Sequence, residues 1–253
     1  MVQSDGFGLA CGVNLRAKPE IVIDAPEALA RLFAARFVAA AHEAIAQRGR
    51  FSCALPGGSV AEIFFPALAQ VLSPEDPIDF FWGDERAVGP DEADSNYGLA
   101  RRLLLEPVGV DPRGVHRMVG ESGDVEAAAR AYEQEMVRTL GEPPRLDLVV
   151  LGLGPDGHIC SLFPGHPLQR ERGRLVAGIL DSPKPPPERI TLTMVPLELA
   201  GAIWIAGFGE SKAAAMREAL EDPASQLPVA LALRAAPRTL VLLDPAAASR
   251  LRV

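Results

Sequence analysis

The chain has 253 residues, 48% of them hydrophobic and 23% charged, a globular composition with enough length to bury a core without metal or disulfide support. Its formal net charge of −8 disfavours a nucleic-acid partner, because binding a phosphate backbone requires clustered lysines and arginines. The three cysteines form no CxxC pair, and no long apolar run or signal-peptide pattern occurs, which argues against a disulfide framework, a zinc site, secretion and a membrane span.

Apolar residues recur at helical spacing over residues 26–48, and Gly49 follows where a C-terminal cap is expected, so this segment is predicted to be a helix. Beyond it, short apolar runs alternate with helical patterns. The predicted strands cover residues 51–55, 78–82, 146–151, 174–180, 190–194, 202–206 and 239–243. The other predicted helices cover residues 60–72, 95–105, 124–140 and 210–221, and residues 83–94 are predicted to form a long acidic loop.

This alternation predicts an α/β fold, a Rossmann-like and mostly parallel sheet with helices on both faces. We expect one domain over residues 1–253, in a cytoplasmic protein that is a monomer or a small homo-oligomer. Ligands of such sheets bind at the carboxyl ends of the strands. The loops that follow predicted strands are therefore where chemistry is expected.

The segment at residues 148–158 runs an apolar strand into a glycine-rich turn that ends on His158. Its residues 152–157 match the dinucleotide pattern G-x-G-x-x-G. That pattern requires a helix directly after the turn, whereas Pro164, Gly165 and Pro167 leave room for barely two turns of helix. We therefore interpret the segment as an active-site loop rather than as a nucleotide site.

Gly57, Gly58 and Ser59 lie between a predicted strand and a predicted helix, where backbone N–H groups can cradle an anion such as a phosphate. The same stretch fits a second interpretation. Ser59 and Glu62 have the spacing of a capping box, which would satisfy the start of the helix without any ligand. The two interpretations are compatible.

Three further segments place charge on the same edge of the sheet. Residues 82–86 follow a strand with Asp84 and Arg86, although a solvated, salt-bridged loop is the commoner fate of such charges. The proline-rich residues 184–189 predict a rigid wall that presents Lys184 or Arg189 to an anion, with a proline-rich partner ligand as the alternative. Lys212 is expected in the first turn of a helix, where a bound anion would explain a cation.

Four segments, taken together, resemble the 6-phosphogluconolactonases in order and spacing along nearly the whole chain. They cover residues 55–59, residues 82–86 with 95–97, residues 152–165 and residues 185–193. The broader resemblance is to the sugar-phosphate superfamily that includes glucosamine-6-phosphate deaminase. The sequence Gly-Asp-Glu-Arg at residues 83–86 is similar to the lactonase version.

The resemblance implies hydrolysis of 6-phospho-D-glucono-1,5-lactone to 6-phosphogluconate, the second step of the oxidative pentose phosphate pathway, without a metal or an organic cofactor. It also implies a catalytic histidine at His158 and a motif arginine at Arg86. The implied phosphate ligands are Gly57, Gly58, Ser59, Arg189 and Lys212. Pro56, Val60 and Cys160 depart from the usual pattern, which puts hydroxyl contacts to the phosphate in doubt but not the backbone cradle.

For the mechanism, we expect His158 to act as general base towards water, since its ordinary pKa lies near 6.5. Asp156 or Asp84 would orient the imidazole, and Arg86 would stabilise developing charge or hold a substrate hydroxyl. No G-x-S-x-G elbow is present, which disfavours a serine nucleophile. The competing hypotheses are an amino-sugar-phosphate deaminase or isomerase, which ammonia release would identify, and a sugar-phosphate sensor, which the acidic composition disfavours.

Overall fold

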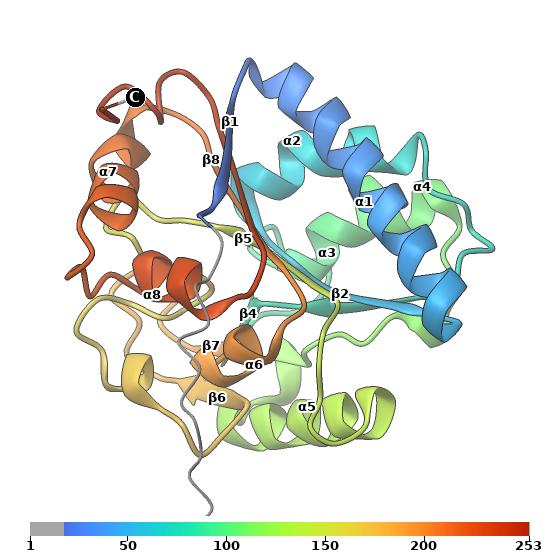
Figure 1. Ribbon diagram of the computed structural model, residues 1–253. Helices are drawn as coiled ribbons and strands as arrows, with labels where there is room; N and C mark the ends of the chain where they lie inside the picture. Colours follow the sequence, from blue (N-terminus) through green and yellow to red (C-terminus); the bar gives the residue numbers. More distant parts are fainter. Residues whose placement is uncertain (1–17, 253) are drawn as a thin grey trace, which may run out of the picture.

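The computed structural model describes residues 18–252, and its centre is a six-stranded parallel sheet (Figure 1). The strand order is β1-β9-β8-β5-β2-β3. The bounds are Glu20–Ile23 for β1, Phe51–Leu55 for β2, Ile78–Trp82 for β3, Leu148–Gly152 for β5, Ile203–Gly207 for β8 and Thr239–Leu243 for β9. Strands β2 and β3 are buried at every position and are apolar except at Ser52 and Asp79, as expected for strands covered on both faces.

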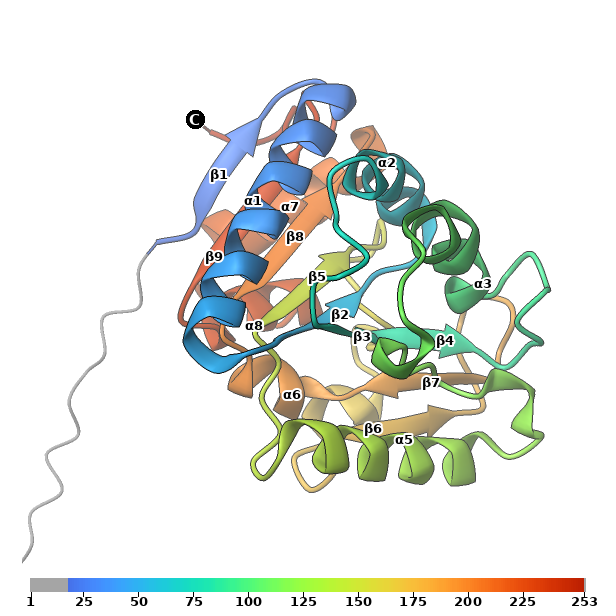
Figure 2. The ribbon, with the colours of Figure 1, turned by 90° about the vertical axis from the view of Figure 1, so that its right-hand side faces the viewer.

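Side chains alternate across the sheet, so each central strand contributes to two hydrophobic cores. In β5, for example, Leu148 and Val150 belong to one core and Val149 and Leu151 to the other. Helices α1 (Pro26–Arg48) and α2 (Gly58–Ala69) cover the first face, as Figure 2 shows. The second face is covered by helices α6 (Met194–Leu199), α7 (Ala213–Glu221) and α8 (Pro228–Ala235). The predicted α/β fold with helices on both faces is confirmed.

A second, antiparallel sheet lies beside the first, with strand order β4-β7-β6. It contains β4 (Asp84–Arg86), β6 (Val176–Ile179) and β7 (Arg189–Leu192), and helix α5 (Val125–Leu140) packs against it. Two predictions were wrong here. Residues 84–86 are a strand rather than part of a loop, and the two predicted strands at residues 174–180 and 190–194 do not join the parallel sheet.

The remaining differences from prediction are local. Strand β1 and helices α6 and α8 were not predicted, and Met194 begins α6 instead of ending a strand. The predicted helix at 95–105 consists of α3 (Asn96–Ala100) followed by a π-helix (Arg101–Leu105). The other short helices are α4, Glu106–Val108, and 3₁₀ turns at Pro112–Gly114, Gly120–Ser122, Pro167–Arg170 and Glu210–Lys212. None of the helices in the described part of the chain has the length and apolarity to cross a membrane.

Candidate active site

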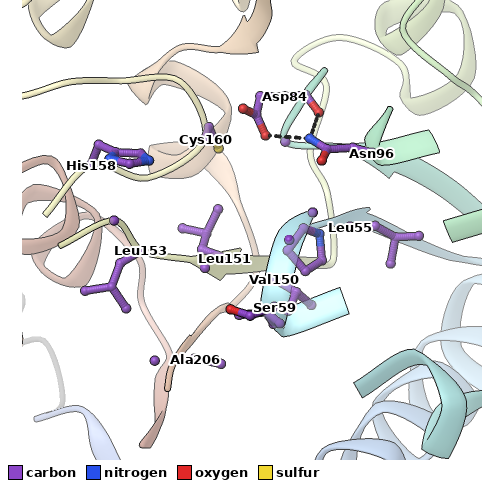
Figure 3. Close-up of a pocket in the computed structure, with 18 of the residues that line it drawn as sticks. Leu55, Ser59, Asp84, Asn96, Val150, Leu151, Leu153, His158, Cys160 and Ala206 are labelled. Carbon is purple, nitrogen blue, oxygen red and sulfur yellow. Dashed lines mark hydrogen bonds between the residues drawn. The ribbon is translucent and has the colours of Figure 1, made fainter. Parts of the chain in front are cut away.

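A pocket of about 280 Å³ opens at the carboxyl ends of β2, β3, β5 and β8. Figure 3 shows it bounded by the loop of His158 and Cys160, by Asp84 with Asn96, and by Ser59 at the start of α2. Of the nine residues predicted for the site, eight line this pocket: Gly57, Gly58, Ser59, Asp84, Arg86, His158, Arg189 and Lys212. The ninth, Asp156, contacts the His158 ring.

His158 and Asp156 form a hydrogen-bonded pair at the edge of the pocket. Nδ1 of His158 lies 2.6 Å from Oδ1 of Asp156, and the imidazole packs against the ring of Phe163 with 4.7 Å between centroids. A carboxylate can only accept, so the proton of the neutral imidazole is on Nδ1 and the lone pair on Nε2. Asp156, rather than Asp84, is therefore the carboxylate that makes this contact.

Burial lowers the pKa of His158 below its ordinary value, and Asp156 opposes that effect. The nearby ammonium of Lys184 lowers the pKa further. Although burial acts against ionisation of Asp156, the hydrogen bonds from His158 and Lys184 hold its pKa below the ordinary range. The pair therefore consists of a neutral imidazole and an ionised carboxylate at neutral pH.

The glycines of the loop serve the histidine rather than a nucleotide. A Cβ at Gly154 would lie 2.0 Å from the His158 ring and 2.5 Å from Oδ1 of Asp156. Gly157 has φ +82°, a left-handed conformation that disfavours other residues. The backbone N–H of Gly154 donates to the carbonyl of His158 at 2.9 Å. Turns and bends follow Gly157 instead of a helix, so the feature that a dinucleotide fingerprint requires is missing from this loop.

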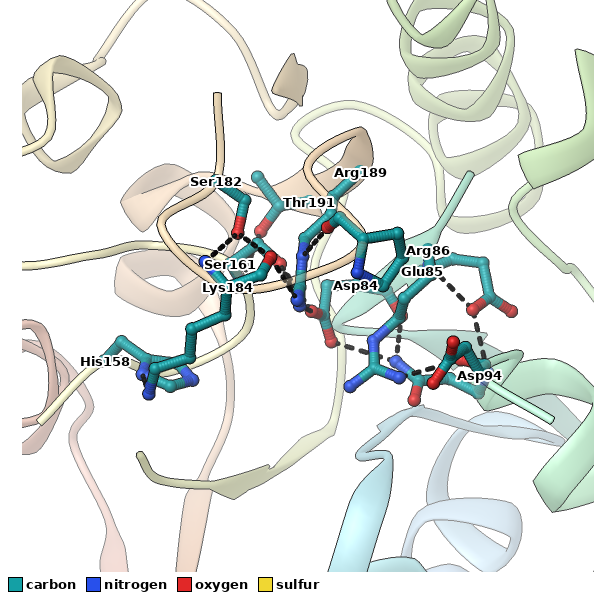
Figure 4. Close-up of polar contacts among 12 residues, drawn as sticks. Asp84, Glu85, Arg86, Asp94, His158, Ser161, Ser182, Lys184, Arg189 and Thr191 are labelled. Atoms are coloured by element: carbon teal, nitrogen blue, oxygen red, sulfur yellow. Dashed lines mark hydrogen bonds and ion pairs between the residues drawn. The ribbon is translucent and has the colours of Figure 1, made fainter. Parts of the chain in front are cut away.

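Asp84 lies at the centre of a buried polar cluster. Its Oδ2 accepts a hydrogen bond from Ser161 Oγ at 2.6 Å, and its Oδ1 accepts one from Asn96 Nδ2 at 3.2 Å. Nη1 of Arg189 is 3.9 Å from the same Oδ2. Figure 4 shows Asp84 with Ser161 and Arg189. The solvated-loop alternative is wrong for Asp84, because only 9% of this residue is exposed.

Glu85, the next residue, fastens β4 to helix α3. Its carboxylate accepts from the backbone N–H groups of Asn96 at 2.7 Å and Tyr97 at 2.8 Å, and from Ser95 Oγ at 3.1 Å. These contacts satisfy N–H groups at the start of α3 that have no partner within the helix. Burial raises the pKa of Glu85, although these hydrogen bonds act in the opposite direction.

The three predicted cations have different surroundings. Arg86 donates from Nη1 to the Asp94 carbonyl at 2.7 Å, and its buried Nε has no hydrogen-bond partner within the described residues. Lys212 is half-buried, which lowers its pKa, and within residues 18–252 its ammonium has no hydrogen-bond or ion-pair partner. Lys212 therefore has donor capacity left for a ligand that enters the pocket, and Arg86 lines the same pocket.

Arg189 is almost fully committed to the protein. Only 4% of it is exposed, and burial lowers its pKa. Its Nε donates to the carbonyl of Pro186 at 3.1 Å, and its Nη2 donates to the carbonyls of Lys184 at 3.1 Å and Pro185 at 3.0 Å. Its Nη1 donates to Ser161 Oγ at 3.4 Å and lies 3.9 Å from Oδ2 of Asp84, so these are its longest contacts. Arg189 thus holds the proline-rich wall together, which its sequence position did not indicate.

The glycine-rich loop enters α2 earlier than the capping-box alternative requires. The N-cap is Gly57, without a side-chain cap, and Ser59 lies exposed in the first turn. A Cβ at Gly57 would lie 1.8 Å from Oδ1 of Asn96, so only glycine fits here. The capping-box interpretation is therefore wrong. The first N–H groups of this helix are without intrahelical partners and lie at the pocket.

Cys160 also lines the pocket. Its backbone has φ 48°, and its thiol would lie 2.9 Å from a Cβ at Gly83. Burial raises its pKa well above the ordinary value, with Asp84 adding to the effect. The thiol therefore stays protonated, and a thiolate nucleophile is disfavoured. Within residues 18–252, no group of three or more His, Cys, Asp or Glu side chains is placed to hold a metal ion.

Asn96 and the Ser161 contact with Asp84 had no predicted role. Ser95 offered a signal for Asn96, since it is an N-cap whose Oγ accepts from Gly98 N at 2.9 Å and so places Asn96 first in α3. Ser161 offered none, because its partner is 77 residues away. Such contacts follow from the pairing of β4 with β7, which no local pattern encodes.

Comparison with known proteins places the chain in a family. The sequence model described as "Glucosamine-6-phosphate isomerases/6-phosphogluconolactonase" matches residues 24–241. The chain belongs to this family. Among curated members, the 6-phosphogluconolactonase of Streptomyces coelicolor is 40% identical over 92% of this chain and 95% of its own length. That of Homo sapiens is 40% identical over 81% of this chain and 83% of its own length.

Solved structures of the family have the same fold. A 6-phosphogluconolactonase from Trypanosoma cruzi superimposes with a TM-score of 0.83 at 30% identity, covering 93% of this chain and 98% of the other. A monomeric glucosamine-6-phosphate deaminase superimposes with a TM-score of 0.76 at 25% identity, covering 92% and 100%. The fold is thus common to both activities of the family, and the site chemistry has to distinguish them.

Proposed function

We propose that this protein hydrolyses 6-phospho-D-glucono-1,5-lactone to 6-phospho-D-gluconate, the second step of the oxidative pentose phosphate pathway, within one domain. The lactonase class is supported by relatives named 6-phosphogluconolactonase that are about 40% identical over most of the chain. The observation that carries the chemistry is the His158–Asp156 pair, whose 2.6 Å hydrogen bond leaves Nε2 unprotonated in a pocket that also contains free cationic groups.

In the proposed mechanism, His158 is the general base. Its Nε2 takes a proton from water as the water oxygen bonds to the lactone carbonyl carbon, and the carbonyl oxygen becomes an oxyanion. The imidazolium then returns the proton to the ring oxygen as the ester bond breaks. Asp156 holds the tautomer, and the guanidinium of Arg86, which lines the pocket, is the group we assign to the developing negative charge.

We assign the phosphate to the other side of the pocket. The first N–H groups of α2 at Gly57, Gly58 and Ser59 favour an anion, and Lys212 supplies a positive charge that has no partner among residues 18–252. We expect Arg189 to contribute through Nη1, whose contacts with Ser161 at 3.4 Å and Asp84 at 3.9 Å are longer than those of its other donors. Asp84 contacts both sides of the site. It accepts one hydrogen bond from Ser161, which also contacts Arg189, and another from Asn96, which lies against the glycine loop.

The direct test generates the lactone in situ with glucose-6-phosphate dehydrogenase and compares 6-phosphogluconate formation with and without the protein. An enzyme-free blank is required because the lactone also opens spontaneously. Acceleration above the blank supports the lactonase. Ammonia released from glucosamine 6-phosphate would support the deaminase instead, and binding of the lactone without acceleration would support a sensor.

Replacing Lys212 with alanine is expected to raise KM by about 10- to 100-fold, with a much smaller change in kcat, because hydrogen bonds to charged groups are worth roughly 1.5–3 kcal/mol. Steady-state rates with the in-situ lactone measure both constants. Arg250→Ala is the matched control, since it removes an exposed cation that does not line the pocket. An unchanged KM in Lys212→Ala would remove this lysine from the phosphate site.

The pH dependence of kcat/KM is expected to show one acidic limb below the ordinary histidine pKa of about 6.5. The base must be neutral to accept a proton, and burial lowers the pKa of His158, so the neutral form persists to lower pH than in a free histidine. Activity is therefore retained above the limb and lost as pH falls through it. Blank-corrected rates at each pH test this, and a limb centred above about pH 7 would contradict it.

A further inference from the structure

The ammonium group of Lys184 lies close to His158, the proposed general base. Its Nζ is 3.2 Å from Oδ1 of Asp156 and also 3.2 Å from Nδ1 of His158. In Figure 4 its side chain runs from the proline-rich wall to the imidazole. Lys184 also lines the pocket, together with the second lysine, Lys212.

The backbone that carries Lys184 is fixed on both sides. Ser182 Oγ accepts from the N–H of Lys184 at 3.3 Å and donates to the Lys184 carbonyl at 2.9 Å. The same carbonyl accepts from Nη2 of Arg189 at 3.1 Å, and Ser182 N donates to the carbonyl of Pro187 at 3.0 Å. This anchoring lowers the entropy cost of holding the long side chain at His158.

One assignment of hydrogen-bond donors and acceptors accounts for the contacts among Lys184, Asp156 and His158. Nδ1–H of His158 donates to Asp156, and the ammonium of Lys184 donates to the same carboxylate oxygen. Both Nζ and Nδ1 are then donors, so the 3.2 Å between them is a close approach of a positive charge to the ring rather than a hydrogen bond. Asp156 alone would favour an imidazolium, whereas Lys184 disfavours it.

We propose that Lys184 is the positioning residue that keeps His158 neutral, and so able to accept a proton, by sharing Asp156 and placing a positive charge beside the ring. This inference rests on the proposed role of His158 as base. The charged groups that face the imidazole are Asp156, Lys184 and, at longer range, Asp84. The lowered pKa of His158 agrees in direction, with burial as the larger cause.

A phosphate-binding Lys184 would behave differently. Loss of a phosphate ligand raises KM and leaves the protonation of His158 in the empty pocket unchanged. Loss of the charge proposed here moves the acidic limb and the pKa of His158 together. The pH profile and the imidazole titration therefore separate the two roles, which a single rate at neutral pH does not.

The experiment titrates the imidazole of His158 by NMR in the wild type, Lys184→Gln and Lys184→Arg. The chain has four histidines, so the His158 signal is assigned by its loss in His158→Gln. Lys184→Gln is expected to raise the pKa of His158 by about one unit, a value reduced for the partial exposure of the lysine. Lys184→Arg keeps the charge and is expected to stay near the wild type.

Lys212→Gln is the matched control, because it removes a lysine from the same pocket that has no contact with the imidazole. Unchanged signals from the other three histidines establish that each variant is folded. A His158 titration in Lys184→Gln that coincides with the wild type would overturn the proposal.

The pH dependence of kcat/KM in Lys184→Gln separates this inference from the proposed function. If the pKa of His158 and the acidic limb both move up by about one unit, Lys184 tunes the catalytic base. If the pKa moves and the limb does not, the electrostatic effect of Lys184 stands and His158 is not the base.

Discussion

Replacing His158 with alanine is expected to reduce kcat by about 10²- to 10⁴-fold, the usual contribution of a positioned general base. The variant removes Nε2, which is the unprotonated nitrogen of the His158–Asp156 pair. The fold should remain, because the histidine lies on a loop at the pocket and belongs to no helix or strand. Blank-corrected lactone hydrolysis gives kcat, and circular dichroism and thermal melting report the fold.

His42→Ala is the matched control for that experiment, since this histidine lies on α1 with 60% of its side chain exposed. It should hydrolyse the lactone at the wild-type rate. Near-normal turnover by a folded His158→Ala protein would remove His158 from the role of base. The pocket would then have to activate water through another group, with Asp84 the remaining carboxylate that lines it.

The substitution Gly154→Ala is expected to reduce kcat by roughly 100-fold without touching a polar group, because misplacement by about 1 Å can cost that much in a positioned site. The new methyl would lie 2.0 Å from the His158 ring and 2.5 Å from Oδ1 of Asp156, so the pair has to move. Steady-state kinetics measure the effect, and the NMR signal of His158 should shift as well.

Gly89→Ala provides the matched control for Gly154→Ala. A Cβ at Gly89 meets its nearest neighbour at 3.7 Å, an ordinary contact, and the backbone there is not left-handed. Wild-type kcat in Gly154→Ala would mean that the loop relaxes around the methyl group. The spacing between Gly154 and the histidine would then not matter for the reaction.

The elements that could be predicted are those whose burial follows from the apolar pattern of their own local sequence. Strands β2 and β3 are apolar at nearly every position, and α1 ends where Gly49 adopts φ 80°. Strand β4 was missed because Asp84, Glu85 and Arg86 have no apolar pattern. It exists because it pairs with β7, about a hundred residues further along. Strand β1 was missed because it is an edge strand whose Ile21 and Ile23 are exposed.

The location of a candidate residue could be predicted where a loop follows a strand, and less so where two loops meet. His158 and Lys212 were predicted at one edge because parallel strands direct their carboxyl ends there, and both line the pocket. The choice between Asp156 and Asp84 could not be made, because it depends on the turn around Gly154 and on the Ser161 contact of Asp84. The capping-box interpretation was wrong because residue spacing does not determine where a helix begins, and here the helix begins at Gly58, before Ser59.

Asn96 joins the two sides of the pocket. Its Nδ2 donates to the side chain of Asp84 at 3.2 Å and to the Asp84 carbonyl at 2.9 Å, while its Oδ1 occupies the space that a Cβ at Gly57 would need. The glycine loop and the strand of Asp84 are therefore mechanically linked through one amide that belongs to neither. A substitution at Asn96 would therefore alter both the partner of Asp84 and the packing of the glycine loop.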